Sequence, residues 1–393
     1  MAFNIPDVDI DIYSPGALAD PYENYRVFRD TAPIVRLPKY DLYLMARFAD
    51  VQAALKNNAL FSSESGIAMN DLMNKAIAGS TLHTDAPYHG TLRAIVSRPL
   101  APARLTELRK GLFDLAENLV ERLVAKGDFD AATELAPYLP ITVVSELVGL
   151  PEEGRERMLI WAGAVFNSLG PRGLELTEAA LPIVEEMVTY ARGCTADRVK
   201  PGSWVAKLYE AAEAGELRPD QVGPVMGDYL GPSLDTTILA TGNTLALFAQ
   251  HPDQWDKLRE NPQLIPSAVN EAIRVESPIQ AFSRVLTDDF SVEDQRLHKG
   301  ARVLMVYASG NRDERRWEDP ERFDITRRAN EQLGFGHGIH MCMGANLARM
   351  EISAVLTALI KRVKGFELHD AERITNNVLR GYKSLKLTAH VAK

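Results

Sequence analysis

The sequence has few cysteines and no long apolar run. Only Cys194 and Cys342 occur among the 393 residues, which excludes a disulfide framework and favours a reducing, intracellular compartment. The longest apolar run, residues 158–166, is nine residues long, whereas crossing a bilayer takes about 20. The N-terminus lacks the basic and apolar regions of a secretory signal. We therefore expect a soluble, cytoplasmic protein that does not enter a membrane.

An excess of basic residues is also absent. The chain has 53 acidic and 44 basic side chains and a net charge of −9, which argues against a nucleic-acid binder. Apolar residues make up 46% and charged residues 25%, values typical of a globular protein. Repeats of 20–50 residues and stretches rich in glycine, serine or proline are missing as well. We therefore predict one large domain over residues 1–393.

The N-terminal third alternates between strand-like and helical patterns. Residues 33–48 place apolar side chains between polar ones and predict a β-hairpin. Asp50 follows and is expected to cap a helix that buries Val51, Ala54 and Leu55.

The middle of the chain is mostly helical between residues 87 and 270. Leucines recur there at spacings of three and four, which predicts a helix with one buried face: Leu105, Leu108, Leu112, Leu115, Leu119 and Leu123. We interpret this face as ordinary core packing.

The C-terminal third returns to strand-like patterns. Residues 282–306 predict strands, and residues 320–333 predict an extended loop. A long helix is expected after Cys342 and extends its apolar face to Val363, and residues 375–391 predict a second hairpin. The predicted fold class is mainly α with a minor β portion.

A glycine-rich loop surrounds Cys342. Gly336, Gly338 and Gly344 allow tight turns and close approach to a flat ligand. A helix that begins near Met343 would favour the thiolate form of the cysteine. A thiolate among backbone N–H groups suits a haem iron ligand.

Other functions of the cysteine loop remain open on these residues alone. A lone cysteine is often an apolar filler. Zinc could bind His337, His340 and Cys342, although this set is one ligand short. A nucleophilic cysteine is also possible, but it has no need for the glycines. Covalent haem attachment requires a C-x-x-C-H run, which is absent.

The spacing Phe335-Gly336-x-Gly338-x-His340-x-Cys342-x-Gly344 resembles the haem-binding signature of the cytochrome P-450 monooxygenases. The resemblance covers essentially the whole chain and implies a single haem-enclosing domain with haem b (iron protoporphyrin IX). It implies that Cys342 is the axial iron ligand and His340 contacts a propionate. Phe335 and Gly336 belong to the same cofactor-binding loop.

Three further motifs occur in the order of the family. The segment around His89 and Arg93 resembles the helix that grips the propionates, and Arg284 occupies another propionate position. Glu271 and Arg274 match an E-x-x-R pair. By resemblance these two residues form a buried structural network with Arg322, which holds the cysteine loop.

Asp235 and Thr236 resemble the acid–alcohol pair of the oxygen-activating helix. The resemblance implies that Asp235 relays protons and that Thr236 hydrogen-bonds oxygen. Pro232 and Ser233 replace the small residue and glycine that the family usually has before the acid. Because proline lacks an N–H and clashes with the carbonyl of residue 228, we predict a sharper kink.

The chain looks closest to the bacterial group that oxidises para-substituted benzoic acids, including by O-demethylation. By position in that group, eight residues would line the substrate pocket: Ile67, Ala68, Phe166, Leu169, Asp228, Pro232, Ile279 and Phe282. The arginines that would anchor a carboxylate are replaced by Ser65 and by Gly227-Asp228. Since burying a carboxylate near Asp228 without a cation is costly, we expect a phenol, methoxyphenol or amine.

The resemblance also implies partners. A separate iron–sulfur ferredoxin and its reductase would pass NAD(P)H-derived electrons to the haem, where O₂ reacts, and Arg98, Arg104 and Arg109 are candidate contacts. We expect a monomer. Two other functions stay open: a peroxide-driven haem oxygenase, which the Asp235–Thr236 pair disfavours, and a non-catalytic haem-dependent binding or sensor protein.

Overall fold

The computed structural model describes residues 4–391, of which the larger part is helical. The helices are α1 (Pro15–Ala19), α2 (Tyr22–Thr31), α3 (Phe48–Lys56), α4 (Asp71–Ala76), α5 (Tyr88–Ser97), α6 (Pro102–Lys126), α7 (Ser145–Val148), α8 (Glu152–Ser168), α9 (Glu175–Gly193), α10 (Trp204–Glu213), α11 (Val222–Leu230), α12 (Asp235–Gln250), α13 (Pro252–Glu260), α14 (Ile265–Val275), α15 (Tyr307–Gly310) and α16 (Ala345–Ile360). The strands are β1 (Ile34–Leu37), β2 (Leu42–Met45), β3 (Phe61–Ser62), β4 (Asp128–Asp130), β5 (Ala281–Leu286), β6 (Phe290–Val292), β7 (Gln295–Leu297), β8 (Arg302–Val306), β9 (Val363–Arg373) and β10 (Tyr382–Val391). Short helical turns are η1 (Pro38–Tyr40), η2 (Thr81–His83), η3 (Arg98–Leu100), η4 (Ala131–Leu135), η5 (Pro140–Val144), η6 (Ala196–Arg198), η7 (Pro219–Gln221), η8 (Pro262–Leu264), η9 (Leu333–Phe335) and η10 (Gly338–His340). The predicted fold class, mainly α with a minor β portion, is confirmed.

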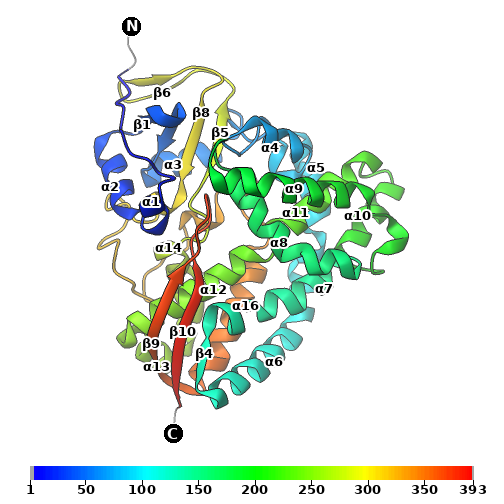
Figure 1. The fold of residues 1–393 in the computed structure, drawn as a ribbon, viewed down its shortest axis with the longest axis vertical. Helices are drawn as coiled ribbons and strands as arrows, with labels where there is room; N and C mark the ends of the chain where they lie inside the picture. The colour runs from blue at the N-terminus through cyan, green and yellow to red at the C-terminus, as the bar shows by residue number, and fades with distance from the viewer. Residues whose placement is uncertain (1–3, 392–393) are drawn as a thin grey trace.

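A five-stranded sheet joins the N-terminal region to the strands near residue 300. Its order is β1-β2-β8-β5-β3, and it lies at the upper left of Figure 1. The antiparallel pair of β1 and β2 confirms the hairpin predicted over residues 33–48. β2 then pairs in parallel with β8, which confirms strands within residues 282–306.

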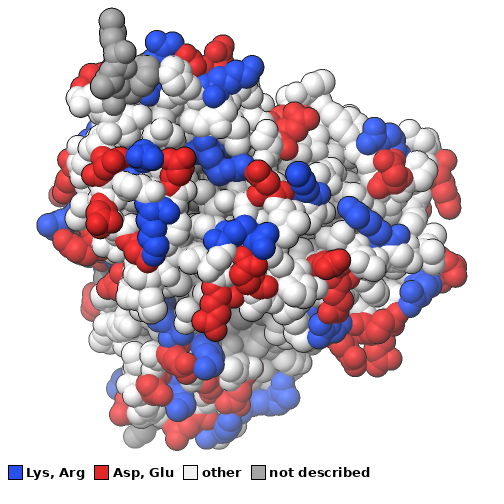
Figure 2. All heavy atoms as spheres, turned by 45° about the horizontal axis from the view of Figure 1, so that its top comes forward, with Lys and Arg blue, Asp and Glu red and all other residues white. Residues whose placement is uncertain are grey.

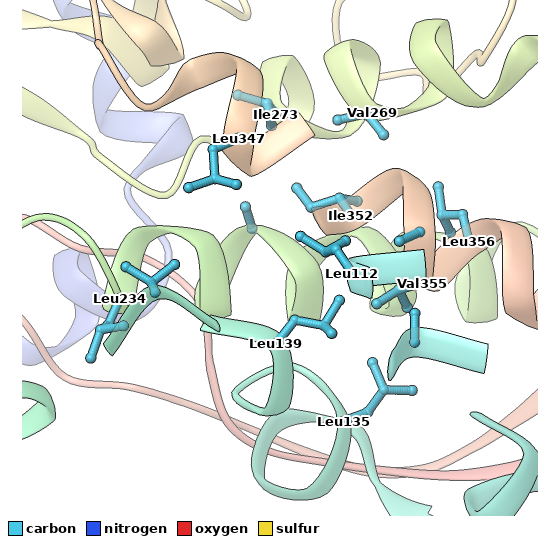
Figure 3. Packing of buried hydrophobic residues seen from close by; sticks show 14 of the residues in the cluster. Leu112, Leu135, Leu139, Leu234, Val269, Ile273, Leu347, Ile352, Val355 and Leu356 are labelled. Carbon is cyan, nitrogen blue, oxygen red and sulfur yellow. The ribbon is translucent and has the colours of Figure 1, made fainter. Parts of the chain in front are cut away.

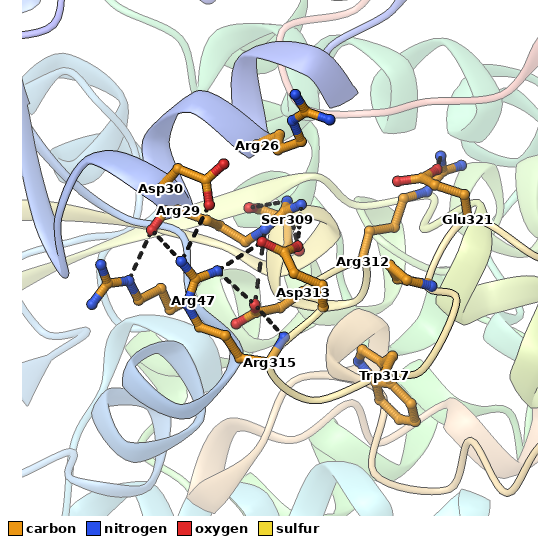
Figure 4. A network of polar contacts seen from close by, with 12 residues as sticks. Arg26, Arg29, Asp30, Arg47, Ser309, Arg312, Asp313, Arg315, Trp317 and Glu321 are labelled. Carbon is orange, nitrogen blue, oxygen red and sulfur yellow. Dashed lines mark hydrogen bonds and ion pairs between the residues drawn. The ribbon is translucent and has the colours of Figure 1, made fainter.

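Helix α3 is capped by a residue far away in the sequence. The Phe48 N–H donates to Asp313 Oδ2 at 2.8 Å, and Asp313 also contacts Arg29 and Arg315 in the network of Figure 4. The predicted cap at Asp50 is therefore wrong: Asp50 lies inside the first turn. A buried carboxylate from another segment satisfies the free N–H that a local cap would take.

The helical core lies between α6, α14 and α16. Figure 3 shows the side chains that meet there: Leu112, Leu135, Leu139, Leu234, Val269, Ile273, Leu347, Ile352, Val355 and Leu356. The predicted leucine face falls on α6, where Leu105, Leu112, Leu119 and Leu123 are buried and the remaining two leucines are half-buried. This packing supports α16, which follows the cysteine loop.

The helix expected around residues 229–237 is interrupted. α11 ends at Leu230 and α12 begins at Asp235, so residues 231–234 leave the helical path. The helix is thus broken around Pro232, which is more than the predicted kink. Leu234 anchors the break, because its side chain is 2% exposed within the core.

The C-terminal predictions need two corrections. α16 ends at Ile360, and Val363 opens β9, where it pairs with Val391. The hairpin therefore consists of β9 and β10 and begins before residue 375; both strands are red in Figure 1. β9 extends through charged residues because its partner β10 supplies the backbone hydrogen bonds. Residues 320–332 carry neither helix nor strand, as predicted.

None of the helices within residues 4–391 has the length and apolar character needed to cross a membrane. Positive and negative side chains are interspersed over the face shown in Figure 2.

Candidate active site

A deep cavity lies between the cysteine loop, α12 and the segment before α5. Its volume is about 2080 Å³, the open solvent at its mouth included. Cys342, His340 and Phe335 line it together with Thr236 of α12 and Phe282 of β5. The sequence motifs that lie far apart in the chain therefore meet around one space.

The cysteine loop is shaped by glycines and one backbone bond. Gly336 and Gly338 have φ values of +67° and +71°, which side chains disfavour. A Cβ at Gly338 would lie 2.3 Å from the Leu55 carbonyl oxygen, so a larger residue cannot fit there. The Cys342 N–H donates to the Phe335 carbonyl at 2.8 Å and closes the loop. This geometry presents Cys342 to the cavity.

The Cys342 thiol is exposed to the cavity but lies deep in the protein. Burial raises its pKa, while the backbone N–H groups of Gly344 and Ala345 and the charges of Arg93 and Arg349 act in the opposite direction. The expected stabilisation of the thiolate is therefore present but is outweighed by burial. A metal cation bound at the sulfur would deprotonate the thiol.

Three of the four predicted propionate contacts line the same cavity: Arg93, Arg284 and His340. Arg93 donates to the Met341 carbonyl beside the cysteine. His340 Nε2 lies 3.1 Å from Asp85 Oδ1, and this pairing orients its ring. These side chains bring cationic and hydrogen-bonding groups to the edge of the cavity.

His89 is close to this group without lining the cavity. Its ring lies 4.6 Å from that of His340, edge to face. Among the described residues, its buried Nε2 has no hydrogen-bond partner. Burial lowers the pKa of His89 to about 4.

A flat group with carboxylates fits these residues. The cavity is large, its walls are mostly apolar, and donors gather at one edge beside an accessible thiol. The chemistry of haem matches this donor set, since an apolar ring needs apolar walls, propionates need cations and iron accepts a thiolate.

The network that supports the cysteine loop differs from the prediction in one member. Arg274 Nε contacts Glu271 Oε2 at 2.7 Å, and both side chains are fully buried. Arg322 contributes only its carbonyl, to Arg274 Nη2 at 3.2 Å, and its side chain is 60% exposed. Arg327 takes the predicted place, with Nε 3.1 Å from Glu271 Oε1. The turn from Asp319 to Arg322 directs the Arg322 side chain to solvent.

Only the alcohol of the predicted acid–alcohol pair lines the cavity. Thr236 lines the cavity, and its hydroxyl donates to the Pro232 carbonyl at 3.0 Å. Asp235 is not a lining residue, and its Oδ2 lies 3.3 Å from where a Cβ on Gly163 would be. Burial raises the pKa of Asp235 to about 7. The adjacent Thr237 also lines the cavity.

Seven of the eight residues predicted to line a substrate pocket line this cavity. The lining contains Ile67, Phe166, Leu169, Asp228, Pro232, Ile279 and Phe282. Ala68 is the exception: it is fully buried, and its carbonyl accepts from Arg302 at 2.8 Å. This hydrogen bond fixes Ala68 against the sheet. Ser65, at the position of the missing arginine, is exposed and outside the lining.

Asp228 is a buried carboxylate in the cavity wall. Its Oδ2 accepts a hydrogen bond from the Thr81 N–H at 2.9 Å. Burial raises its pKa to about 6, although the contacts with Thr81 and the Leu82 backbone and the charge of Arg93 act against this shift. Asp228 therefore joins α11 to η2 as well as facing the cavity.

Two titratable lining residues that have an unpartnered buried atom within the described chain escaped the sequence analysis. His83 is 5% exposed, and its Nε2 lacks a hydrogen-bond partner within the described chain. Glu351 is 2% exposed, its Oε1 is likewise unpartnered in residues 4–391, and burial raises its pKa to about 8. The sequence offers a signal only for Glu351, which follows Cys342 closely and lies on α16.

Comparisons with known proteins agree with this site. The family described as Cytochrome P450 matches residues 198–388. The relative cytochrome P450 CYP199A2 from Rhodopseudomonas palustris is 36% identical over 389 residues, which cover 98% of this chain and 94% of the relative. Linalool 8-monooxygenase from Pseudomonas putida is 30% identical, with 93% and 95% covered. The solved structure of cytochrome P450 CYP109Q5 from Chondromyces apiculatus superposes with a TM-score of 0.82 at 28% identity, over 98% of this chain and 99% of that one. The chain belongs to the cytochrome P450 family.

Proposed function

We propose that this chain is a haem-thiolate monooxygenase that inserts one oxygen atom of O₂ into a small aromatic substrate, by hydroxylation or oxidative O-demethylation. The observation that carries the proposal is that Cys342 and Thr236 line one cavity. When bound, haem b supplies the activation of O₂. The protein supplies the thiolate, the walls and the protons.

Different residues of the site would bind the cofactor and supply protons. Cys342 would ligate the iron, and Arg93, Arg284 and His340, which line the same cavity, would hold the propionates. The Thr236 hydroxyl holds a proton at the cavity surface. Asp235, protonated below about pH 7, is the proton reservoir behind it and reaches the cavity by rotation of its side chain or through water.

The substrate is a neutral or cationic aromatic molecule. Ile67, Phe166, Ile279 and Phe282 provide an apolar wall that suits a ring. Asp228 is the acidic group of this wall, and a phenol can donate to it or an amine can pair with it. A benzoate would place a second carboxylate in the same apolar surroundings at considerable cost.

A titration of the ferric haem spin state tests this proposal. The three ligands are para-methoxybenzoate, para-methoxyphenol and para-methoxybenzylamine. A shift with the phenol or the amine supports the proposed substrate class. A shift with the benzoate alone would show that another group anchors a carboxylate and would remove Asp228 from substrate recognition.

Electrons come from NAD(P)H through a ferredoxin reductase and an iron–sulfur ferredoxin. The α6 helix packs beside α16, which continues from the cysteine loop. The candidate docking residues differ in availability, because Arg98 pairs with Glu216 and Arg104 with Glu107. Arg109 stacks instead on Phe113, 4.5 Å from the ring centroid. A cytoplasmic monomer remains a prediction of the sequence.

A peroxide-driven reaction is the second candidate. It is favoured by the position of Asp235, whose carboxyl is not in the cavity lining, since peroxide use requires less proton delivery. Product formation with NADH, ferredoxin and reductase should exceed that with hydrogen peroxide if the monooxygenase proposal is correct. The reverse order would favour a peroxygenase, and product in neither assay would favour a haem-dependent binding protein or sensor.

A further inference from the structure

His83 has an unused hydrogen-bonding atom beside the proposed cofactor edge. It is the last residue of η2, is 5% exposed and lines the cavity. Its Nδ1 lies 3.0 Å from the hydroxyl oxygen of Ser80. Its Nε2 is buried and, within residues 4–391, has no hydrogen-bond partner. A buried polar atom left in this state costs free energy, so a partner outside the chain is expected.

The contact with Ser80 indicates what that partner is. When the Ser80 hydroxyl donates to Nδ1 of the neutral ring, the ring proton lies on Nε2. Nε2 is then a donor, and it requires an acceptor. Burial lowers the pKa of His83 to about 3, and the charges of Arg284 and His340 act in the same direction. The ring therefore stays neutral, in surroundings that favour an anion.

The neighbours of His83 indicate which anion it contacts. Arg284 and His340, whose positive charges would oppose protonation of His83, are both proposed propionate contacts and line the same cavity. Asp228 lies nearby in the wall, but it accepts a hydrogen bond from Thr81, and as an acid it repels a second carboxylate. A carboxylate near His83 is therefore more favourable beside Arg284 and His340 than beside Asp228.

We propose that the Nε2–H of His83 donates a hydrogen bond to a haem propionate, as a second imidazole at the cofactor edge besides His340. This inference rests on the haem binding of the proposed function. The carboxylate chemistry could also come from a substrate, so the experiment separates the two sources.

The test measures haem loss from the purified haem-loaded protein to excess apomyoglobin. The variant His83→Phe keeps a ring but removes the donor, and His83→Gln restores a donor in a different side chain. We expect His83→Phe to lose haem about ten- to hundredfold faster, the size of effect typical of one hydrogen bond to a charged group, and to have a more negative reduction potential. His83→Gln should recover part of both. His369→Phe, on the exposed face of β9, is the matched control and should match the parent.

Esterified haem identifies the acceptor. In protein reconstituted with haem dimethyl ester, the propionates carry no charge and accept only a weaker hydrogen bond, so the difference between parent and His83→Phe should shrink. Ser80→Ala should accelerate haem loss by a smaller factor, because without the Ser80 hydroxyl the proton of the neutral ring is no longer held on Nε2.

Three results would overturn the inference. Equal haem loss by parent and His83→Phe would exclude the contact. An effect of undiminished size with the ester would exclude the propionate as acceptor. Unchanged haem loss with weaker para-methoxybenzoate binding would assign the contact to a substrate carboxylate. A parent chain that binds no haem would contradict the proposed function as well as this inference. Haem binding by the parent therefore distinguishes failure of the proposed function from failure of the His83 contact alone.

Discussion

Arg327 Nε lies 3.1 Å from Glu271 Oε1 and joins the loop after residue 320 to helix α14. Glu271 is fully buried and Arg327 is 16% exposed, so the contact is shielded from water. We predict that Arg327→Ala lowers the free energy of unfolding by about 1–3 kcal/mol, as expected when a hydrogen bond to a buried charge is lost. Urea unfolding of the haem-loaded protein measures this.

Arg322→Ala is the matched control, since the Arg322 side chain is 60% exposed and donates nothing to Glu271. Its effect should stay within about 0.5 kcal/mol. Equal destabilisation by both substitutions would contradict the assignment of Arg327.

The buried Asp235 should make stability depend on pH. Burial raises its pKa from 3.8 to about 7, so between these values the folded chain retains a proton that the unfolded chain releases. Stability contributed by this group therefore falls as pH rises through that window. Relative to the parent, Asp235→Asn should gain about 2–4 kcal/mol between about pH 4 and about pH 8. The exposed Asp9→Asn serves as control, and a flat difference between Asp235→Asn and parent would disprove the raised pKa.

The ionisation of Asp228 should select charged substrates. Because burial raises its pKa to about 6, the carboxyl is mostly neutral at about pH 5 and mostly ionised at about pH 7.5. The dissociation constant of para-methoxybenzylamine should fall about tenfold over this range, whereas that of para-methoxyphenol should change little. Asp228→Asn should remove the pH dependence of amine binding. Amine binding that ignores both pH and the substitution would exclude Asp228 as the anchor.

The break between α11 and α12 should depend on Pro232. An alanine there restores an N–H that can donate to the carbonyl of residue 228, so α11 can gain a turn. We expect Pro232→Ala to change stability by at most about 1 kcal/mol and to move the Pro232 carbonyl that accepts from Thr236. A crystal structure of the variant and its spin-state titration measure both effects. Retention of the break would place its cause in the packing of Leu234.

Arg109 should contribute most among the candidate docking arginines. It is exposed on α6, and its guanidinium lies over the ring of Phe113 rather than beside a carboxylate. Arg109→Glu should slow reduction by ferredoxin about tenfold at low salt, with a smaller difference at high salt because ions screen the interaction. Stopped-flow reduction measures the rate. Arg26→Glu, on α2, should leave it unchanged, and equal slowing by the two would rule out a specific surface.

Local patterns predicted much of the fold, because hairpins and helix faces follow from residue spacing. The hairpin of β1 and β2 and the buried face of α6 are examples. The cap at the start of α3 was predicted wrongly because Asp313, which accepts from the Phe48 N–H, comes from a distant segment. Val363 fits a helical face, but its pairing with Val391 places it in a strand.

The candidate site shows the same division. The spacing around Cys342 predicted the loop that lines the cavity, since the glycines and the cysteine act locally. Arg322 and Arg327 both lie in the loop after residue 320, and only the course of this loop decides which of them reaches Glu271. His83 has no motif of its own, so its unpartnered nitrogen becomes visible only in three dimensions.

The five-stranded sheet can be completed only after most of the chain has been synthesised. β1, β2 and β3 are complete by Ser62, but their partners β5 and β8 begin at Ala281, about 220 residues later along the growing chain. At about 5–20 residues per second, β2 and β3 wait roughly 10–45 s on the ribosome before they can pair with β8 and β5. During that time the edges of the early hairpin are open to other chains, which makes this segment the natural client of chaperones.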